Sequence, residues 1–341
     1  MRKNKRFLLI MLLISVLVLS ACGQSKNTET NGSETDSKAN DSPSGISVSA
    51  APLGGTFNNY ATGWANVIGE KMNIATNVEA TAGPIINIEL VDRGESDIGL
   101  VTMGPAYEAY NGIGWADKKY ENIRSIFPMY TSYLHWIALP GSNIKSVMDL
   151  EGKVIGTGAK GGTPDYYTGL LVEDLGIKIG RIVNGSFSDY ANQMADGQMD
   201  AFGTFSPTGH PTAVQVIKTM GANVIGVGEK SKEIAEKHGI TSGIIKANSY
   251  EGQTEDIETI TVWSAYIASK DLSEDFVYEL VKTTFESKEE LAKVIKEAKE
   301  LSLDVIAESI GNIPLHPGAI KYYAEQGIEL PDSAYPPEYQ K

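Results

Sequence analysis

The sequence predicts an α/β protein with two lobes joined by two crossover strands, and three observations support this class. Short apolar runs alternate with segments of helical periodicity, which is the pattern of βαβ units and a parallel sheet. The alternation fills residues 46–102 and starts again at residue 152. Two long apolar runs, Leu134–Leu139 and Thr259–Ile267, lie where the chain would pass between two such sets.

The expected elements follow in chain order. The first set comprises the strand Ile46–Ala51, the helix Phe57–Met72, the strand Val78–Ala80, the helix Ile85–Val91 and the strand Ile98–Thr102. It is followed by the strand-like runs Ile123–Tyr130 and Leu134–Leu139. The second set comprises the strand Val154–Ile155, the helix Thr163–Leu175, the strand Arg181–Asn184, the helix Asp189–Ala195, the strand Met199–Phe202, the helix Thr212–Met220 and the strand Ala222–Val227. After Thr259–Ile267, apolar spacing predicts helices in Phe276–Phe285 and Leu291–Ile306. One lobe would therefore hold residues 46–134 plus 268–341, and the other residues 135–267.

The first 45 residues are not expected to belong to either lobe. A basic start, the apolar run Phe7–Leu19 and small residues before Cys22 predict a signal peptide over residues 1–21. The run is too short for a transmembrane helix. Leu19-Ser20-Ala21-Cys22 resembles the lipobox of bacterial lipoproteins, in which cleavage leaves the cysteine, here Cys22, as the lipid-bearing first residue. The alternative is a plain signal peptide with a cysteine there by chance. Residues 22–45 are polar and predict a flexible tether to the cell membrane.

Composition argues against several classes of function. The net charge is −14, and removal of residues 1–21 takes away four basic and no acidic residues, which leaves −18. Nucleic-acid binding needs a basic face and is not expected. Cys22 is the only cysteine, and the four histidines show no metal-ligand spacing, so we expect no metal site. Gly156–Gly161 fits G-x-G-x-x-G but lacks the acidic residue about 20 positions on that a dinucleotide site needs. Without a G-x-S-x-G motif for a nucleophile, we expect neither a cofactor nor an enzyme.

Three glycine turns lie between a strand and a helix, at Leu53–Thr56, Thr81–Pro84 and Gly156–Gly162. Each junction presents backbone N–H groups and the positive end of a helix dipole. In the third turn, Thr163 is a suitable N-cap and Pro164 a suitable first helical residue. Since ligands of α/β sheets bind where strands end and helices begin, the three turns predict one shared crevice for an anionic or polar ligand.

The candidate ligand-binding residues come from these turns, from strand ends and from nearby aromatic positions. They are Gly55, Thr56, Tyr60, Thr81, Gly83, Asn87, Thr102, Tyr130, Gly158, Gly161, Gly162, Thr163 and Thr204. Thr81 and Thr163 rank first because each combines a side-chain oxygen with a helix start. For the two tyrosines, packing in a core explains the sequence as well as ligand contact does. Lys160 could pair with a carboxylate, although an exposed loop lysine is the commoner case.

Four short motifs occur in one order along the chain: Gly94–Ile98, Asp149–Val154, Gly197–Ala201 and Leu315–Ile320. In this order, behind a lipobox, the chain from about Ile46 to Leu330 resembles the TAXI family of extracytoplasmic solute receptors for TRAP transporters. The resemblance implies a type II periplasmic-binding-protein fold with two crossover strands. It also implies capture of a small organic solute, often an acidic amino acid such as glutamate or a related carboxylate.

The expected function is therefore that of a monomeric, membrane-tethered receptor for a small carboxylate-bearing solute. Its lobes would close on the solute, and the TRAP membrane subunits would recognise the closed form. The competing interpretation is a surface lipoprotein with an adhesin or structural role, which would bind no transport ligand.

Overall fold

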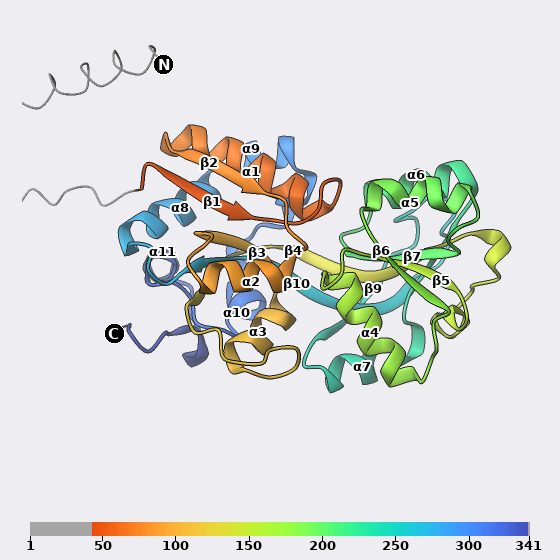
Figure 1. Cartoon of the computed structure of the whole chain (residues 1–341). Helices are drawn as coiled ribbons and strands as arrows, with labels where there is room; N and C mark the ends of the chain where they lie inside the picture. Colours follow the sequence, from red (N-terminus) through yellow and green to blue (C-terminus); the bar gives the residue numbers. More distant parts are fainter. Residues whose placement is uncertain (1–42, 340–341) are drawn as a thin grey trace, which may run out of the picture. The chain divides into compact units, whose positions relative to one another are not determined.

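A ten-stranded mixed sheet runs through residues 43–339, the part of the chain that the computed structural model describes (Figure 1). The predicted signal peptide, the predicted lipid attachment at Cys22 and nearly all of the predicted tether lie outside these residues. Residues 43–339 lie in one compact unit. Within residues 43–339, no helix combines the length and the apolar character needed to cross a bilayer.

The main strand order of the sheet is β2-β1-β3-β10-β4-β7-β5-β6, with β8 paired to β4 and β9 to β10. The strands are β1 (Gly45–Ser49), β2 (Ala75–Glu79), β3 (Ile98–Thr102), β4 (Ile123–Ala138), β5 (Val154–Gly158), β6 (Arg181–Asn184), β7 (Ala201–Ser206), β8 (Asn223–Ile225), β9 (Thr241–Ile245) and β10 (Ile257–Ser269). Pairing is parallel among β1, β2 and β3 and among β5, β6 and β7. The expected parallel sheet is therefore correct for each end, but wrong for the centre, because β4 and β10 run antiparallel to their neighbours.

Helices cover both ends of the sheet. They are α1 (Thr56–Met72), α2 (Pro84–Asp92), α3 (Met103–Asn111), α4 (Thr163–Leu175), α5 (Phe187–Ala195), α6 (Pro211–Met220), α7 (Ser231–Lys237), α8 (Glu274–Glu286), α9 (Lys288–Val294), α10 (Ile306–Ile310) and α11 (Pro317–Glu325). In Figure 1, α1, α2, α3 and α8 gather around β1–β3, and α4–α7 gather around β5–β9. The long strands β4 and β10 pass between the two groups.

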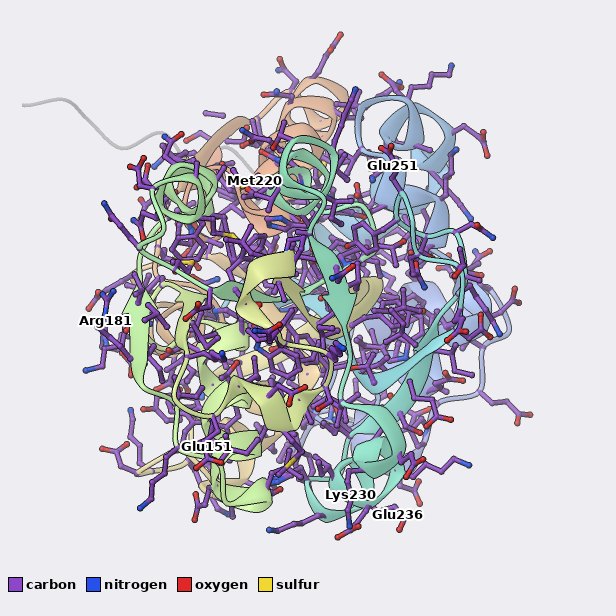
Figure 2. All side chains as sticks on the ribbon, turned by 90° about the vertical axis from the view of Figure 1, so that its right-hand side faces the viewer. Glu151, Arg181, Met220, Lys230, Glu236 and Glu251 are labelled. Carbon is purple, nitrogen blue, oxygen red and sulfur yellow. The ribbon has the colours of Figure 1, made fainter. Side chains whose placement is uncertain are left out.

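The two groups of elements have separate buried cores. The first core is a single cluster from residues 46–130 and 265–334. The second core consists of two clusters, both from residues 134–262. Figure 2 looks onto the end of the unit that carries the second core, where the labelled charged side chains are all exposed and point outward: Glu151, Arg181, Lys230, Glu236 and Glu251. Apolar burial is thus divided between two centres, as the two predicted sets of βαβ units require.

The strand β4 corrects one expectation. Ile123–Tyr130 and Leu134–Leu139 were expected as two strands, but a single strand of 16 residues runs through the polar residues between them. Ser132 keeps its hydroxyl paired inside the sheet, 2.9 Å from the hydroxyl of Ser264 on β10. Pro128 has no N–H for the ladder, and the register between β4 and β10 shifts beside it. A β-bulge of this kind is where a sheet tolerates proline.

Other differences are local. Helices α3, α7, α10 and α11 and strand β9 were not expected, and β7 begins two residues later and ends four residues later than the predicted strand. The helix α3 was not predicted because Gly104 and Pro105 usually indicate a turn. Proline is nevertheless tolerated in the first turn of a helix, where both residues lie. The predicted helix Leu291–Ile306 is interrupted after α9, where Ile295 is extended and buried. Tertiary packing of one apolar side chain there overrides helical periodicity.

Two buried histidines are held in the neutral form. In β4, the Nδ1–H of His135 donates to the carbonyl two residues earlier (2.9 Å), so its Nε2 accepts from the hydroxyl of Tyr250 (2.7 Å). At the start of α11, the Nε2–H of His316 donates to the carbonyl of Leu272, and its Nδ1 accepts from an amide two residues later. Burial lowers the pKa of His135 and that of His316 to about 4 each. His316 therefore has a structural role.

We expect the free energy of unfolding to fall as the pH drops from about 6.5 to about 4. In this window an unfolded histidine binds a proton and a buried neutral one does not, so acidification favours the unfolded state. The stabilising effect is complete above the unfolded pKa. Below the unfolded pKa, each such histidine lowers the free energy of unfolding by up to about 1.4 kcal/mol per pH unit.

Urea denaturation at several pH values measures this slope. The variant His135→Gln should reduce it by about one proton relative to the native sequence. A free energy of unfolding that stays constant across the window would contradict the assignment of neutral, buried histidines.

Candidate functional site

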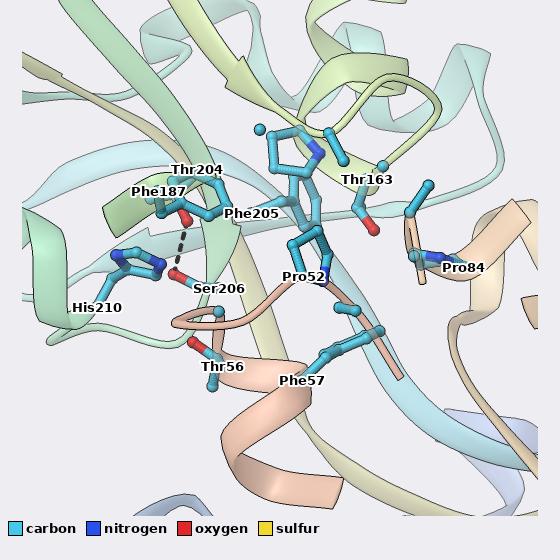
Figure 3. Close-up of a pocket in the computed structure, with 18 residues that line it drawn as sticks. Pro52, Thr56, Phe57, Pro84, Thr163, Phe187, Thr204, Phe205, Ser206 and His210 are labelled. Carbon is cyan, nitrogen blue, oxygen red and sulfur yellow. Dashed lines mark hydrogen bonds between the residues drawn. The ribbon is translucent and has the colours of Figure 1, made fainter. Parts of the chain in front are cut away.

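A cavity of about 60 Å³ lies where helix starts from both cores meet the ends of the strands (Figure 3). Its walls come from the residues just before or at the start of α1, α2, α4, α5 and α6, and from β7. The volume is far below the 300–1,000 Å³ of pockets for drug-sized ligands. The cavity therefore suits a small solute.

Four of these helices start without a side-chain cap. The N-cap residues Gly55, Gly83, Gly162 and His210, before α1, α2, α4 and α6, accept no hydrogen bond on a side chain from the first helical amides. Among the described helices, α5, which also borders the cavity, and α8 and α11 are capped by Ser186, Ser273 and His316, whereas α3, α7, α9 and α10 have no side-chain cap. An uncapped helix start leaves backbone donors and a partial positive charge for another partner. Four such starts surround one small cavity.

No charged side chain lines the cavity among the described residues. Polar side chains gather at its two ends. Figure 3 shows His210, Ser206, Thr204 and Thr56 at one end and Thr163 at the other, with Pro52, Phe57 and Phe205 between them. An apolar wall with a few polar groups at defined places is typical of a solute pocket, because the polar groups fix the orientation of the ligand.

The turn between β5 and α4 is held in shape by Asp165. Its carboxylate accepts from the hydroxyl of Thr157 (2.6 Å), from the amide of Gly161 (3.0 Å) and from the side-chain amide of Asn184 (2.8 Å). These bonds take up the carboxylate oxygens, so Asp165 organises the turn. Gly161 consequently serves the turn and does not line the cavity.

Gly83 and Gly162 meet across the cavity from opposite cores. Gly83 has a φ of 117°, which side chains rarely allow, and a Cβ built on it would lie 3.6 Å from the Cα of Gly162. Gly162 is extended and is the N-cap of α4, so Thr163 is the first helical residue. The expectation that Thr163 itself is the N-cap is wrong by one position.

His210 differs from the other buried histidines because neither ring nitrogen has a hydrogen-bond partner within the described protein. Its side chain is 2% exposed and lines the cavity. Burial lowers its pKa to about 3, so the ring is neutral at physiological pH. The ring packs against Phe187, with centroids 4.8 Å apart. Other buried side chains, such as Tyr60 and Trp136, also have an unpaired polar atom, but among these residues His210 is the one that lines the cavity, where a ligand could reach it.

Seven of the thirteen predicted residues line the cavity: Gly55, Thr56, Gly83, Gly158, Gly162, Thr163 and Thr204. Lys160 is exposed and lies outside the lining. His210 is absent from the predicted set, as are Pro52, Phe187, Phe205 and Ser206. The sequence does carry a signal for His210, because Gly209-His210-Pro211 lies between a strand and a helix like the other turns.

Six predicted residues lie outside the lining, and Asn87 and Thr81 show why. The Asn87 side-chain amide donates to the carbonyls of Ala50 (2.6 Å) and Leu100 (2.7 Å), at the ends of β1 and β3. The Thr81 hydroxyl donates to the Asn87 side-chain oxygen (2.6 Å) and accepts from the amide of Gly83 (3.0 Å). These two residues build the turn that presents Gly83.

The remaining predictions are also supporting residues. Tyr60 and Tyr130 pack in the first core with ring centroids 5.5 Å apart, and both are fully buried. Burial raises the pKa of each hydroxyl. Thr102 is buried, with its hydroxyl 3.4 Å from that of Thr163. No group of three or more histidine, cysteine or acidic residues in residues 43–339 is arranged to hold a metal ion.

Comparison with known proteins gives a family and a fold. The model of the NMT1-like family matches residues 48–327. The structure is similar to that of the periplasmic binding protein BugD, with a TM-score of 0.54 and 16% identity over 83% of this chain and 93% of that one. It is also similar to a structure described as a periplasmic transporter, with a TM-score of 0.52 and 15% identity over 82% and 94% of the two chains. At such identities the likeness shows the fold alone, and it confirms the predicted two-lobed periplasmic-binding-protein fold with two crossover strands.

Replacement of Asn87 with alanine is expected to lower the free energy of unfolding by about 2–4 kcal/mol, because two buried carbonyls lose their donor. Urea denaturation measures the change. Asn77→Ala is the matched control, since the exposed Asn77 side chain donates only to Glu79 and its loss should cost little. A stable Asn87→Ala protein that no longer bound its solute would contradict the supporting role and favour direct ligand contact.

Proposed function

The chain belongs to the NMT1-like family, and on that premise we propose that it is an extracytoplasmic receptor for a small carboxylate-bearing solute. In the narrower form of the proposal, the receptor is of the TAXI type and delivers the solute to the membrane subunits of a TRAP transporter. It acts as a binding protein without catalysis. A lipid on Cys22 and the tether of residues 22–45 would hold it at the membrane.

One observation carries the proposed ligand class: four uncapped helix starts converge on a cavity that has no charged side chain of residues 43–339 in its lining. A helix N-terminus stabilises an anion by about 0.3–1 kcal/mol, and by up to about 2 kcal/mol in a partly buried site. Several starts acting together favour a buried carboxylate. A cation would have neither an acidic partner nor favourable dipoles there.

Contacts across the cavity support a closed conformation of two lobes, residues 46–134 plus 268–341 and residues 135–267. The hydroxyl of Tyr166 donates to the carboxylate of Glu108 (2.6 Å), and the hydroxyl of Ser186 donates to the carbonyl of Leu53 (3.3 Å). Thr102 and Thr163 also meet between the two sets. A solute enclosed between the lobes would bind the closed state better than the open one, which is the condition for closure by a ligand.

The proposal is tested by thermal unfolding of the full chain, purified in detergent, against acids and their uncharged amides. We expect a shift of several degrees with at least one small carboxylic acid and none with its amide, because the helix starts favour the charged group. Pairs such as succinate and succinamide isolate the charge. Stabilisation by neutral sugars alone would contradict the carboxylate class, and saturable binding of no small molecule would favour the adhesin interpretation.

Tyr166→Phe is expected to weaken binding of the tightest acid about fivefold, because the closed state loses about 1 kcal/mol of hydrogen bonding while the open state loses little. Isothermal titration calorimetry measures the affinity. Tyr278→Phe is the matched control, since Tyr278 donates to Glu325 (2.7 Å) with both residues in the first lobe. Equal effects of the two variants would argue against a contact specific to closure.

A further inference from the structure

The cavity has an unused hydrogen-bonding group that the carboxylate-binding helix starts do not explain. His210 is buried, lines the cavity and has no partner for either ring nitrogen among residues 43–339. Leaving both nitrogens unpaired costs stability in the empty protein. The ring of His210 packs against Phe187 and Phe202, and an apolar ring could make these contacts without leaving unpaired nitrogens.

The chemistry of His210 defines what it can bind. A neutral imidazole offers one N–H donor and one nitrogen lone pair. Two of the neighbouring hydroxyls are already committed as donors: Thr204 donates to Ser206 (3.1 Å), and Ser206 donates to the carbonyl of Pro207 (3.0 Å). His210 is thus the buried side chain at this end with an uncommitted N–H, and the hydroxyl oxygens beside it retain lone pairs. A ligand oxygen that accepts a hydrogen bond from the His210 N–H fits this end. A ligand hydroxyl could in addition donate to one of the neighbouring hydroxyl oxygens.

His210, at the start of α6, lies apart from the starts of α2 and α4. In Figure 3, His210 and Thr163 lie at opposite ends of the cavity, and apolar residues such as Pro52 and Phe57 lie between them. Because the cavity holds only about 60 Å³, a single short solute can reach both ends. An ammonium group at the His210 end would be buried without an acidic partner, because no carboxylate lines the cavity among the described residues.

We propose that His210 is the specificity-determining residue of the cavity and that the preferred solutes are small carboxylic acids with a second, uncharged oxygen. The hydroxyl or carbonyl oxygen of such a solute accepts from the His210 N–H, while its carboxylate meets the helix starts of α2 and α4. The inference rests on the proposed function and narrows it to hydroxy and oxo acids. Amino acids of the same length bind more weakly.

Two series of acids that differ at one carbon test this preference. The three-carbon series is propionate, lactate, pyruvate and alanine, and the five-carbon series is glutarate, 2-hydroxyglutarate, 2-oxoglutarate and glutamate. Affinities for the full chain in detergent are measured by isothermal titration calorimetry. In the series that fits, a hydroxy or oxo acid should bind about 10- to 100-fold more tightly than both the unsubstituted acid and the amino acid.

Variants at His210 separate ligand recognition from a structural role. His210→Leu should remove the preference for the added oxygen while retaining or raising the thermal stability of the empty protein, because two unpaired buried nitrogens disappear. His210→Gln keeps a donor and an acceptor and should restore part of the preference, and it replaces the leucine variant as the test if that protein does not fold. His316→Gln, at a histidine whose nitrogens are both paired, is the control that should leave the preference unchanged.

The possible outcomes test the role of His210 and the proposed receptor function separately. An unchanged preference in His210→Leu, or the tightest binding by alanine or glutamate, would overturn the role of His210 and leave the carboxylate receptor intact. No binding of any acid in either series, or of those in the acid–amide pairs, would overturn the proposed function itself. A loss of thermal stability in His210→Leu without any change in affinity would assign the imidazole a purely structural role.

Discussion

The antiparallel pairing of β4 and β10 is the constraint on which the rest of the structure depends. These two strands are hydrogen-bonded over most of their length, and each also pairs with strands at one or both ends of the sheet. Two separate cores can form because two strands long enough to enter both connect them. The bulge beside Pro128 lets this pairing persist through a residue that cannot donate to the ladder. A crevice between two cores is then unavoidable, and it lies where the parallel strands of both ends finish.

The crevice acquires its chemistry from groups left without partners. Four helix starts that meet at the cavity have no side-chain cap, so their first backbone amides stay available there. The unpaired nitrogens of His210 add a second set of free groups at the same place. Native proteins satisfy nearly all buried polar groups, so unsatisfied groups that line a cavity are available to a ligand. The unpaired groups lower the stability of the empty protein. In the proposed receptor, a solute that forms hydrogen bonds with them would restore that stability.

The turns that line the cavity could be located from the sequence, whereas the directions of several side chains could not. A glycine turn between a strand and a helix is a local feature, so Gly55, Gly83 and Gly162 could be located from sequence spacing alone. Asn87 has the same local signature as a ligand residue, an amide in the first turn of a helix, yet its side chain points back to strands β1 and β3. Tyr60 lies on the core face of α1. The direction of a side chain depends on neighbours distant in sequence, which periodicity does not encode.

The sequence by itself determined the class of fold, the order of most elements and the places where helices begin, because apolar periodicity, glycine and proline act over a few residues. Only the tertiary structure decided that β4 is one strand, that it runs antiparallel to β7 and β10, and that His210 faces the cavity without a partner. These features arise from pairing between residues far apart in the chain. Whether a polar group finds a partner is known only when every segment that packs around it is in place.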